Sequence, residues 1–348
     1  MVPMPRFRWS IPPQCPRSRR SRPARCRGAL HSMTSRRRAL ATLVLAAFAL
    51  PAQSAGREVS PLEAIGWKLF FDPLLSKPRN TSCSSCHIPE KGFESGVALG
   101  EGAYGDTLPR NAPTVVNLAD AEFFFWDGRA GSLEEQAKGP IENPIEMDLA
   151  HDEAARRVRE EAAYVESFRQ AGINEITMDA IAQAIAAFER GLATGPTLFD
   201  KWLAGDRSVF DEAQERGRMI FFTRGQCATC HFGPNFTDGA FHNIGTGTAD
   251  DPGRWKISND DYDFGAFKTP ALRNWKGREP FMHDGRFETL DDVLAFYNEP
   301  KTDALGETEL DPLGLSKQDH SDIKAFLETL NGAWPDLAAY EAAWQALQ

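Results

Sequence analysis

The chain contains Cys83-Ser84-Ser85-Cys86-His87 and, further on, Cys227-Ala228-Thr229-Cys230-His231, and these two pentapeptides decide how it folds. The CxxCH pattern is typical of covalent c-type haem attachment. Two thiols three positions apart can each form a thioether with a haem vinyl group, while the adjacent histidine offers an imidazole nitrogen to the iron. Because the motifs use every cysteine after residue 26, the sequence predicts a redox protein with two covalently bound haem c groups.

Two other uses of these cysteines are weaker. Paired CxxC motifs also bind zinc, but zinc ribbons are small, whereas each motif here lies in a segment of domain length. A disulfide framework is disfavoured because haem attachment would leave none of the four downstream cysteines free. Both motifs therefore favour haem.

Residues 1–55 differ from the rest of the chain, with 11 Arg, no Lys and no acidic residue. Arg36-Arg37-Arg38 precedes an apolar run, Ala39–Leu50, which is followed by small residues around Ala52–Ala55. This pattern is typical of a secretory signal peptide, with Met33 as a plausible start. The run is shorter than the roughly 20 residues that span a membrane. We therefore expect cleavage and a periplasmic protein without a stable membrane anchor; an uncleaved anchor is the alternative.

Composition predicts a globular protein with two domains. The 348 residues are 42% hydrophobic and include eight Trp and 23 Phe, which is enough for real cores. Without residues 1–55, the 39 basic residues fall by 11 to 28, against 49 acidic ones, a formal net charge of −21. Such a charge disfavours nucleic acid and anionic membranes as partners and favours a basic redox protein, such as a small cytochrome c or a cupredoxin. Solubility alone is the alternative explanation.

An internal repeat surrounds the two motifs. The matched segments are Gly66–Phe71 and Gly217–Phe222, Pro113–Asn117 and Pro270–Asn274, Asp127–Arg129 and Asp284–Arg286, and Leu133–Glu135 and Leu290–Asp292. The spacing between successive matched segments after the motifs is the same in both halves. We infer two homologous haem domains, residues 56–205 and residues 206–348, after a leader of 1–55.

Local signals indicate a mainly α protein. Ser60-Pro61-Leu62-Glu63 has a serine N-cap, proline at the first helical position and glutamate at N3, which predicts a helix start. Apolar spacing predicts helices over 152–170 and 177–191, and another that starts at Ser321 and stops at Gly332. Because strand patterns are scarce, the expected fold is mainly α, with two tandem cytochrome c-like haem domains and long loops.

The repeat is asymmetric at one informative place. The residue 13 positions after Asp127 is Pro140, whereas the residue 13 positions after Asp284 is Tyr297. A phenolate can ligate haem iron, but proline has no side-chain donor. A core tyrosine is the plain alternative for Tyr297, and Met282 is a competing ligand that its place in the repeat disfavours. The alignment predicts an open first iron and a second iron closed by Tyr297.

Two longer segments carry a family resemblance. FWDGRAGSLEEQAKGPIENPIEM (Phe125–Met147) and TPALRNWKGREPFMHDGRFETLDDVLAFY (Thr269–Tyr297), with both CxxCH motifs, resemble the bacterial di-haem cytochrome c peroxidases and, more closely, their MauG-type relatives. The resemblance covers residue 58 to about 330. It implies a C-terminal haem that shuttles electrons and an N-terminal haem that meets hydrogen peroxide. Tyr297 falls where classical peroxidases have an axial Met and MauG-type enzymes have Tyr.

The resemblance also implies roles for residues around the first haem. His87 and His231 match the proximal iron ligands, and Glu146 matches the distal carboxylate over the peroxidatic iron, with Gln136 and Pro140 lining the same pocket. Splitting peroxide needs a group that takes a proton from the near oxygen and returns it to the leaving oxygen, which a carboxylate can do. Without the resemblance, the sequence would favour a solvated acidic residue in a loop as the interpretation of Glu146.

Further matches lie between the haems. Trp126 matches the tryptophan that stands between the two haems, where an oxidisable indole would assist electron transfer; a core tryptophan is the alternative. Asn111, with the backbone carbonyls of Arg278 and Pro280, matches an inter-haem calcium ion.

One departure from the family pattern is informative. Classical members close the resting peroxidatic haem with a histidine about 16 residues after the motif, but position 103 is Ala and no histidine occurs between His87 and His151. We therefore predict a first haem that is open at rest, with high-spin iron. His242 and His283 are expected to be structural or to bind haem propionates.

Three functions follow as hypotheses. The first is a periplasmic di-haem peroxidase that reduces hydrogen peroxide at the N-terminal haem with electrons delivered through the C-terminal haem. The second is a MauG-type oxidase that modifies Trp or Tyr residues of a protein substrate, although Phe221, Phe222 and Gly225 stand where that enzyme has a tryptophan before its second motif. The third is a non-catalytic electron carrier or peroxide sensor, against which Pro140 and Glu146 argue.

Overall fold

Helix α1 (Pro61–Phe71) starts with the capping box that the sequence predicts. The Ser60 hydroxyl accepts the Glu63 N–H at 3.3 Å, and the Glu63 carboxylate accepts the Ser60 N–H at 2.9 Å. The computed structural model describes residues 58–300 and 308–348. The expected signal peptide and its cleavage site lie outside these residues.

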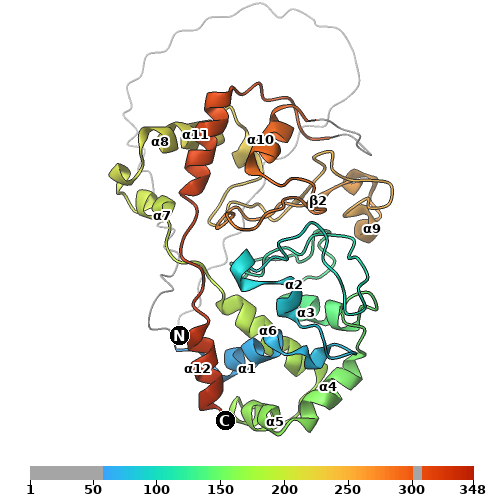
Figure 1. The fold of residues 1–348 in the computed structure, drawn as a ribbon. Helices are drawn as coiled ribbons and strands as arrows, with labels where there is room; N and C mark the ends of the chain where they lie inside the picture. Colours follow the sequence, from blue (N-terminus) through green and yellow to red (C-terminus); the bar gives the residue numbers. More distant parts are fainter. Residues whose placement is uncertain (1–57, 301–307) are drawn as a thin grey trace, which may run out of the picture. The chain divides into compact units, whose positions relative to one another are not determined.

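The described residues form helices joined by long loops, with one short strand pair among them (Figure 1). They all fall within one compact unit, Phe48–Gln348. The elements up to residue 209 are α1, η1 (Pro73–Leu75), α2 (Cys83–Cys86), η2 (Pro89–Lys91), α3 (Leu133–Glu142), α4 (His151–Glu160), α5 (Ala162–Gln170), α6 (Met178–Gly191), α7 (Leu198–Leu203) and η3 (Arg207–Val209). The later ones are α8 (Glu212–Phe221), η4 (Cys227–Thr229), β1 (Phe241–His242), α9 (Trp255–Ser258), η5 (Asp261–Asp263), β2 (Phe267–Lys268), α10 (Leu290–Asn298), α11 (Lys317–Glu328) and α12 (Ala338–Ala346). The mainly α fold is confirmed.

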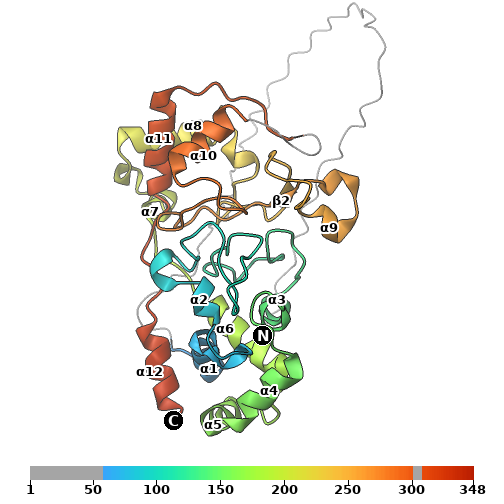
Figure 2. The ribbon, with the colours of Figure 1, turned by 45° about the vertical axis from the view of Figure 1, so that its right-hand side comes forward.

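One helix pair occurs twice in this fold. Helix α1 packs on α6, and α8 packs on α11, as Figures 1 and 2 show from two sides. A Cβ atom on Gly66 would lie 1.8 Å from the Ala184 carbonyl oxygen, and one on Gly217 would lie 1.8 Å from the Asp322 carbonyl oxygen. Only glycine lets two backbones approach this closely. The repeat seen in the sequence thus corresponds to one packing arrangement used twice.

The loops that follow each motif repeat as well. Residues with left-handed backbone and isolated bridges recur at matched positions. The matched features are Asn117 and Asn274, with φ of 61° and 49°, Phe125 and Met282, with φ of 63° and 77°, and the bridges Phe124 to Ala130 and Phe281 to Phe287. A left-handed φ is uncommon for residues other than glycine, so its recurrence reflects a shared loop conformation.

Two expected helix boundaries need correction. Residues 152–170 form two helices, α4 and α5, with extended backbone at Glu161 between them. Helix α11 starts at Lys317 and not at Ser321, so that prediction was wrong. The reason is a complete capping box at Ser316, whose hydroxyl accepts the Asp319 N–H at 3.2 Å while the Asp319 carboxylate accepts the Ser316 N–H at 2.9 Å.

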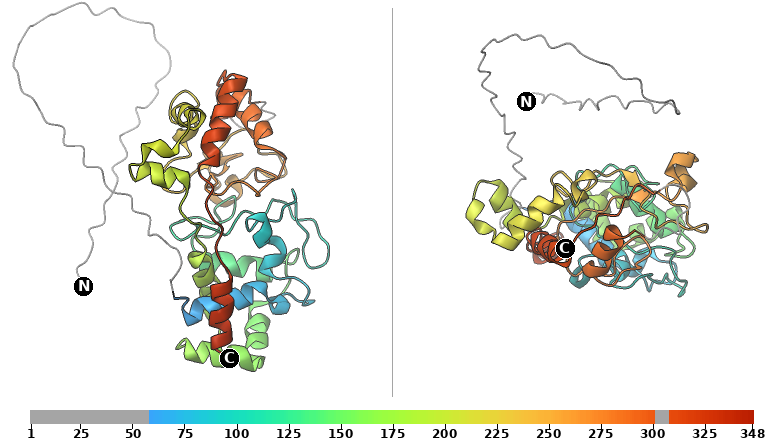
Figure 3. Two further views of the ribbon diagram at one scale, coloured as in Figure 1. Left: turned by 60° about the vertical axis from the view of Figure 1, so that its left-hand side comes forward. Right: turned by 90° about the horizontal axis from the view of Figure 1, so that it is seen from above.

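The last helix returns to the first core. Tyr340 of α12 is buried in the cluster that contains Phe70 of α1 and Phe188 of α6. Figures 1 and 3 show α12 beside α1, although the two lie at opposite ends of the described chain. No sequence pattern indicates this contact, which ties the end of the chain to the first helix pair. None of the helices in the described ranges is long and apolar enough to cross a membrane.

Candidate haem sites

The first CxxCH motif forms the short helix α2 and ends on His87. The His87 Nδ1 atom lies 3.1 Å from the Phe93 carbonyl oxygen. Because a carbonyl oxygen can only accept, Nδ1 carries the proton and Nε2 keeps a free lone pair. Burial lowers the pKa of His87, which keeps the ring neutral. A neutral imidazole held by a backbone carbonyl is the usual form of a metal-ligating histidine.

The second motif repeats this arrangement. The His231 Nδ1 atom lies 3.0 Å from the Phe236 carbonyl oxygen, which leaves Nε2 free in the same way. Burial again lowers the pKa of the ring. Phe93 and Phe236 are both buried, so each carbonyl is held by a fixed aromatic anchor. The two histidines are therefore presented in equivalent ways.

The motif cysteines fit haem better than zinc. All four are free thiols in the described chain. The one group of metal-ligating side chains found in residues 58–300 and 308–348 is Cys230, Asp238 and His242, which contains a single cysteine. Structural zinc prefers several thiolates in one tetrahedral site. Burial raises the pKa of the Cys83 thiol and raises that of Cys227 to about 12, so neither is a ready thiolate.

A buried carboxyl without a partner lies close to the first motif. Glu189 of α6 is buried, and its Oε2 atom has no hydrogen-bond partner among the described residues. Burial raises the pKa of Glu189 to about 8, and the Glu189 charge is one of the influences that raise the pKa of Cys83. An orphaned polar atom beside free thiols and a free imidazole nitrogen is consistent with a polar cofactor edge in this place. Together with the histidine geometry, the residues fit a c-type haem.

Helix α3 and the loop after it carry the expected peroxide pocket. Gln136 and Pro140 lie four residues apart on α3, so they share a helix face. Pro140 has no N–H, which leaves the Gln136 carbonyl without its helical partner. Glu146 follows in the loop, and the Met147 N–H donates to the Pro140 carbonyl at 3.2 Å. The structure therefore holds the Glu146 backbone beside the helix that carries the other two.

Opposing influences act on the pKa of the Glu146 carboxyl. Burial raises its pKa, while a hydrogen bond from the Asn143 amide at 2.6 Å and the charge of Arg129 act in the opposite direction. Its charge is also one of the influences that raise the pKa values of Cys83 and Cys86. The Glu146 side chain is thus half-buried near the first motif and is not a fully solvated loop acid.

Arg129 was not singled out in the sequence beyond its place in the repeat. Its guanidinium lies 3.5 Å from the centre of the Phe125 ring and donates to Asp127 at 2.9 Å. In the sequence, Arg129 stands out only as part of the repeated Asp-Gly-Arg segment. That segment does not indicate that the charge of Arg129 acts on the Glu146 carboxyl.

Position 103 is occupied by a buried alanine. The Ala103 N–H donates to the Glu146 carbonyl at 2.7 Å, so this loop lies against the segment that carries Glu146. Its side chain offers no ligand. The loop packs tightly there, because a Cβ on Gly102 would lie 1.8 Å from the Ile145 carbonyl oxygen.

Tyr297 occupies the equivalent place near the second motif. Helix α10 carries it, and its hydroxyl has no hydrogen-bond partner among the residues that the structure describes. Burial raises its pKa, with smaller contributions from the charges of Cys227 and Cys230. The hydroxyl is thus close to the second motif. Met282 lies in the left-handed turn before α10.

Trp126 joins segments of the two halves. Its indole N–H donates to the Asn111 carbonyl at 2.9 Å, and its ring meets His283 edge to face at 6.4 Å. The Asn111 N–H in turn donates to the His283 carbonyl at 2.7 Å. The Lys268 N–H donates to the Trp126 carbonyl at 2.8 Å. The tryptophan is therefore anchored on both sides.

Two ion-pair networks that join distant segments were not predicted from the sequence. Glu94 and Arg278 form a buried pair at 2.6 Å, with exposed fractions of 5% and 8%. Arg110 bonds to both Asp127 and Asp251 at 2.7 Å. In each network, the side chains come from distant parts of the chain. The backbones of Arg278 and Pro280, expected at a calcium ion with Asn111, belong to the loop that Glu94 contacts.

His242 and His283 both have close partners among the described residues. His242 lies between Asp238, at 2.9 Å, and Glu309, at 2.7 Å, and hydrogen bonding chiefly to Asp238 raises its pKa to about 12. His283 stacks on Phe267 with ring centres 3.6 Å apart.

Comparisons with known proteins agree with this geometry. The family model described as di-haem cytochrome c peroxidase matches residues 60–208. The chain is 39% identical over 273 residues to the methylamine utilization protein MauG of Methylorubrum extorquens, covering 77% of each protein. It is 36% identical over 292 residues to cytochrome c551 peroxidase of Nitrosomonas europaea, covering 82% of this chain and 84% of that protein. A solved MauG-like protein associated with microbial copper homeostasis has a TM-score of 0.72 at 29% identity, covering 82% of this chain and 95% of that one. The chain therefore belongs to the di-haem cytochrome c peroxidase family and is an oxidoreductase.

Proposed function

We propose that the protein is a periplasmic di-haem peroxidase with two tandem haem domains, which reduces hydrogen peroxide at the first motif and takes electrons in at the second. The observation that carries this proposal is the asymmetry between two otherwise equivalent sites. Pro140 and the half-buried Glu146 accompany the first motif, whereas Tyr297, whose hydroxyl has no hydrogen-bond partner among the described residues, accompanies the second. An open iron beside a proton-transfer group suits peroxide; a closed iron suits electron transfer.

The chain's own residues would divide the work as follows. Cys83, Cys86 and His87 would hold the first haem, which supplies an iron able to exchange electrons with peroxide. Glu146 would accept the proton from the near oxygen of peroxide and return it to the departing oxygen. The Asn143 amide, 2.6 Å from the Glu146 carboxylate, fixes the direction in which that carboxylate points.

Cys227, Cys230, His231 and Tyr297 would hold the second haem. Trp126, anchored by Asn111 and beside His283, supports a route for electrons between the halves. The acidic chain favours a small basic donor, such as a cytochrome c or a cupredoxin.

A second candidate function is oxidation of a protein substrate in the manner of a MauG-type enzyme. It is favoured by Tyr297 at the second motif and by the 39% identity to a MauG protein. In that case Trp or Tyr residues of another protein would supply the electrons.

The deciding experiment mixes the oxidised, haem-loaded protein with peroxide and follows its spectrum, then adds reduced cytochrome c. We expect a high-spin and a low-spin iron at rest, and rapid oxidation of two cytochromes per peroxide. A long-lived oxidised state with slow cytochrome oxidation would favour the protein-modifying function. Two six-coordinate irons that do not react with peroxide would contradict both the peroxidase and the protein-modifying function. An electron carrier or sensor would then be the remaining hypothesis.

We also propose a calcium ion held by Asn111 and the carbonyls of Arg278 and Pro280. Calcium binds oxygen ligands, and these three would join the two halves. Removing it with a chelator is expected to slow electron transfer between the haems, and calcium addition is expected to restore the rate. No bound calcium in the purified protein by elemental analysis would contradict the proposal.

A further inference from the structure

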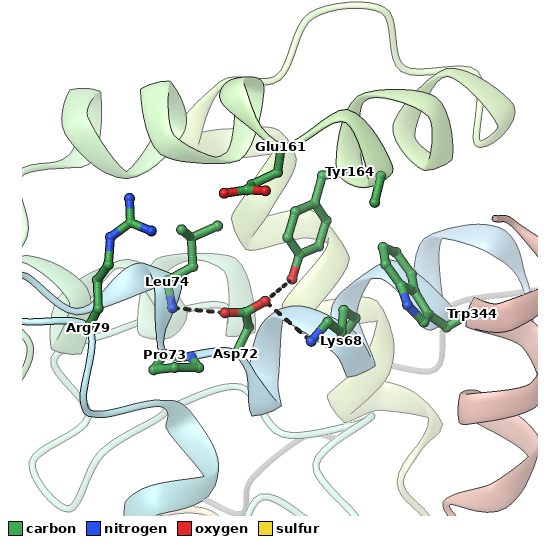
Figure 4. A pocket seen from close by; sticks show the side chains of 9 residues that line it. Lys68, Asp72, Pro73, Leu74, Arg79, Glu161, Tyr164 and Trp344 are labelled. Carbon is green, nitrogen blue, oxygen red and sulfur yellow. Dashed lines mark hydrogen bonds and ion pairs between the residues drawn. The ribbon is translucent and has the colours of Figure 1, made fainter.

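A pocket of about 280 Å³ lies between α1, α5 and α12, and none of its lining residues comes from α3. Figure 4 shows its lining, in which the rings of Tyr164 and Trp344 are accompanied by four charged side chains, Lys68, Asp72, Arg79 and Glu161. Neither Glu146 nor the motif residues contribute to it. The pocket is therefore separate from the residues assigned to the two haem sites.

The Tyr164 hydroxyl has a proton acceptor within hydrogen-bond distance, as the coupled loss of an electron and a proton requires. Its hydroxyl donates to Asp72 Oδ2 at 2.8 Å, and the same oxygen lies 3.3 Å from Lys68 Nζ (Figure 4). Only 3% of Tyr164 is exposed. Oxidising a buried phenol leaves an acidic proton that must go to a nearby base, and the Asp72 carboxylate is that base. Burial raises the pKa of Tyr164, so the phenol stays protonated until it is oxidised.

A row of aromatic rings joins this pocket to the first proximal histidine. Ring centres are 6.3 Å apart between His87 and Phe70, 5.2 Å between Phe70 and Phe188, and 5.1 Å between Phe188 and Tyr340. Tyr340 and Trp344 are one turn apart on α12 and so share a face. The Trp344 ring lies 5.3 Å from Tyr164. Oxidisable rings thus reach from the pocket to within two phenylalanines of His87.

We propose that this pocket is a second substrate site, at which small phenolic reductants deliver electrons to the first haem through Tyr164, Trp344 and Tyr340. The inference rests on the proposed peroxidase function, because peroxide is the oxidant. Helix α12 covers the first core and also contributes two rings, Tyr340 and Trp344, to this row.

The electrons and protons balance over one peroxide. One electron leaves Tyr164 toward the haem, and its phenolic proton passes to Asp72. A phenol in the pocket then gives one electron and one proton to the Tyr164 oxygen, which restores the O–H bond, and Asp72 releases its proton to water. Two such turns supply two electrons, and hydrogen peroxide with two protons becomes two water molecules.

Lys68 and Arg79 line the pocket together with the carboxylates of Asp72 and Glu161. Since Lys68 pairs with Asp72, Arg79 is the cation available to a carboxylate on a phenol. Arg79 is exposed and forms no ion pair within residues 58–300 and 308–348. A guanidinium binds carboxylates through two parallel hydrogen bonds. Ferulate, a small phenol with a carboxylate, is therefore the probe of choice.

The test uses the haem-loaded protein and two readouts. The first is the tyrosyl radical detected by electron paramagnetic resonance after peroxide is added without any donor. We expect a strong signal in the wild type and in Tyr262→Phe, which changes an exposed tyrosine, and a loss of the signal in Tyr164→Phe. Asp72→Asn removes the proton acceptor and is expected to lower the signal roughly a hundredfold. The second readout is peroxide-driven ferulate oxidation, which should fall in the same variants and in Arg79→Gln.

Cytochrome c oxidation distinguishes a failure of the second-site proposal from a failure of the peroxidase proposal. If Tyr164→Phe oxidises cytochrome c as the wild type does and also keeps the radical signal, the second site is refuted while the peroxidase stands. If the wild type oxidises neither cytochrome c nor ferulate, the peroxidase proposal fails first. Circular dichroism of Tyr164→Phe guards against a folding artefact, since phenylalanine keeps the packing of the ring.

Discussion

The buried pair between Glu94 and Arg278 is expected to be the strongest single electrostatic link between the two halves. The carboxylate and guanidinium meet at 2.6 Å with exposed fractions of 5% and 8%. Arg278 also donates to the Ala271 and Arg273 carbonyls, at 3.2 and 3.3 Å. Glu94 follows Phe93, whose carbonyl holds His87. Breaking the pair is therefore expected to weaken both the fold and the hydrogen bond that positions His87.

The magnitude follows from burial. Arg278→Met leaves a carboxylate unpaired in the interior, and Glu94→Gln leaves an arginine that cannot lose its charge. Each single change is expected to lower the free energy of unfolding by about 3–5 kcal/mol. The double variant leaves no buried charge, and we expect it to lose only about 1–2 kcal/mol from imperfect hydrogen bonding. The two changes should thus be strongly non-additive.

The assay is guanidinium unfolding of all four proteins, followed by circular dichroism, at several pH values. Burial already raises the pKa of Glu94, and Arg278 holds it down, so Arg278→Met raises it further. A raised carboxyl pKa means that the folded variant binds a proton more tightly than the unfolded one. The deficit of Arg278→Met should therefore shrink as the pH falls through that pKa. Additive single effects, or a deficit that grows toward acid pH, would refute the reasoning.

The remaining predictions concern single positions. Gly66→Ala and Gly217→Ala each place a Cβ 1.8 Å from a backbone oxygen and should cost about 3 kcal/mol or more in unfolding free energy, whereas Gly131→Ala should cost under about 1; equal losses would contradict the packing argument. Glu146→Gln should lower peroxide turnover about 10²–10⁴-fold without changing haem content, and wild-type turnover should fall as the pH drops through a pKa above 4.5, since the base must be ionised; a flat profile would speak against this role. His242→Asn should destabilise the protein most below pH 6.5, because a histidine pKa raised to about 12 adds stability that is fully present there and is lost progressively as the pH rises toward 12; thermal unfolding at pH 6 and pH 10 checks this.

Local signals in the sequence are enough to predict the repeated helices. The capping box at Ser60 and the glycines at Gly66 and Gly217 specify helix starts and helix contacts within a few residues, so the repeat is recognisable from the sequence alone. The predicted start of α11 was wrong, because a capping box at Ser316 competed with a serine five residues later.

Side-chain networks that join distant segments carry no local signal. Glu94 and Arg278 are 184 residues apart, and Arg110 and Asp251 are 141 apart. Their charges look like ordinary surface residues in the sequence. Only the fold brings them together, and the same holds for α12, whose sequence does not indicate that it packs on the first core.

The symmetry of the two sites narrows the source of their expected difference. His87 and His231 meet backbone carbonyls at 3.1 and 3.0 Å, and both rings are kept neutral by burial. The hydrogen bonds on the histidine side are thus the same, so they cannot set one iron apart from the other. If Tyr297 closes the second iron as we propose, the difference lies at the matched positions 140 and 297, where the repeat has proline in one half and tyrosine in the other. We therefore expect that exchanging the residues at positions 140 and 297, and not changing the motifs, would convert one kind of site into the other.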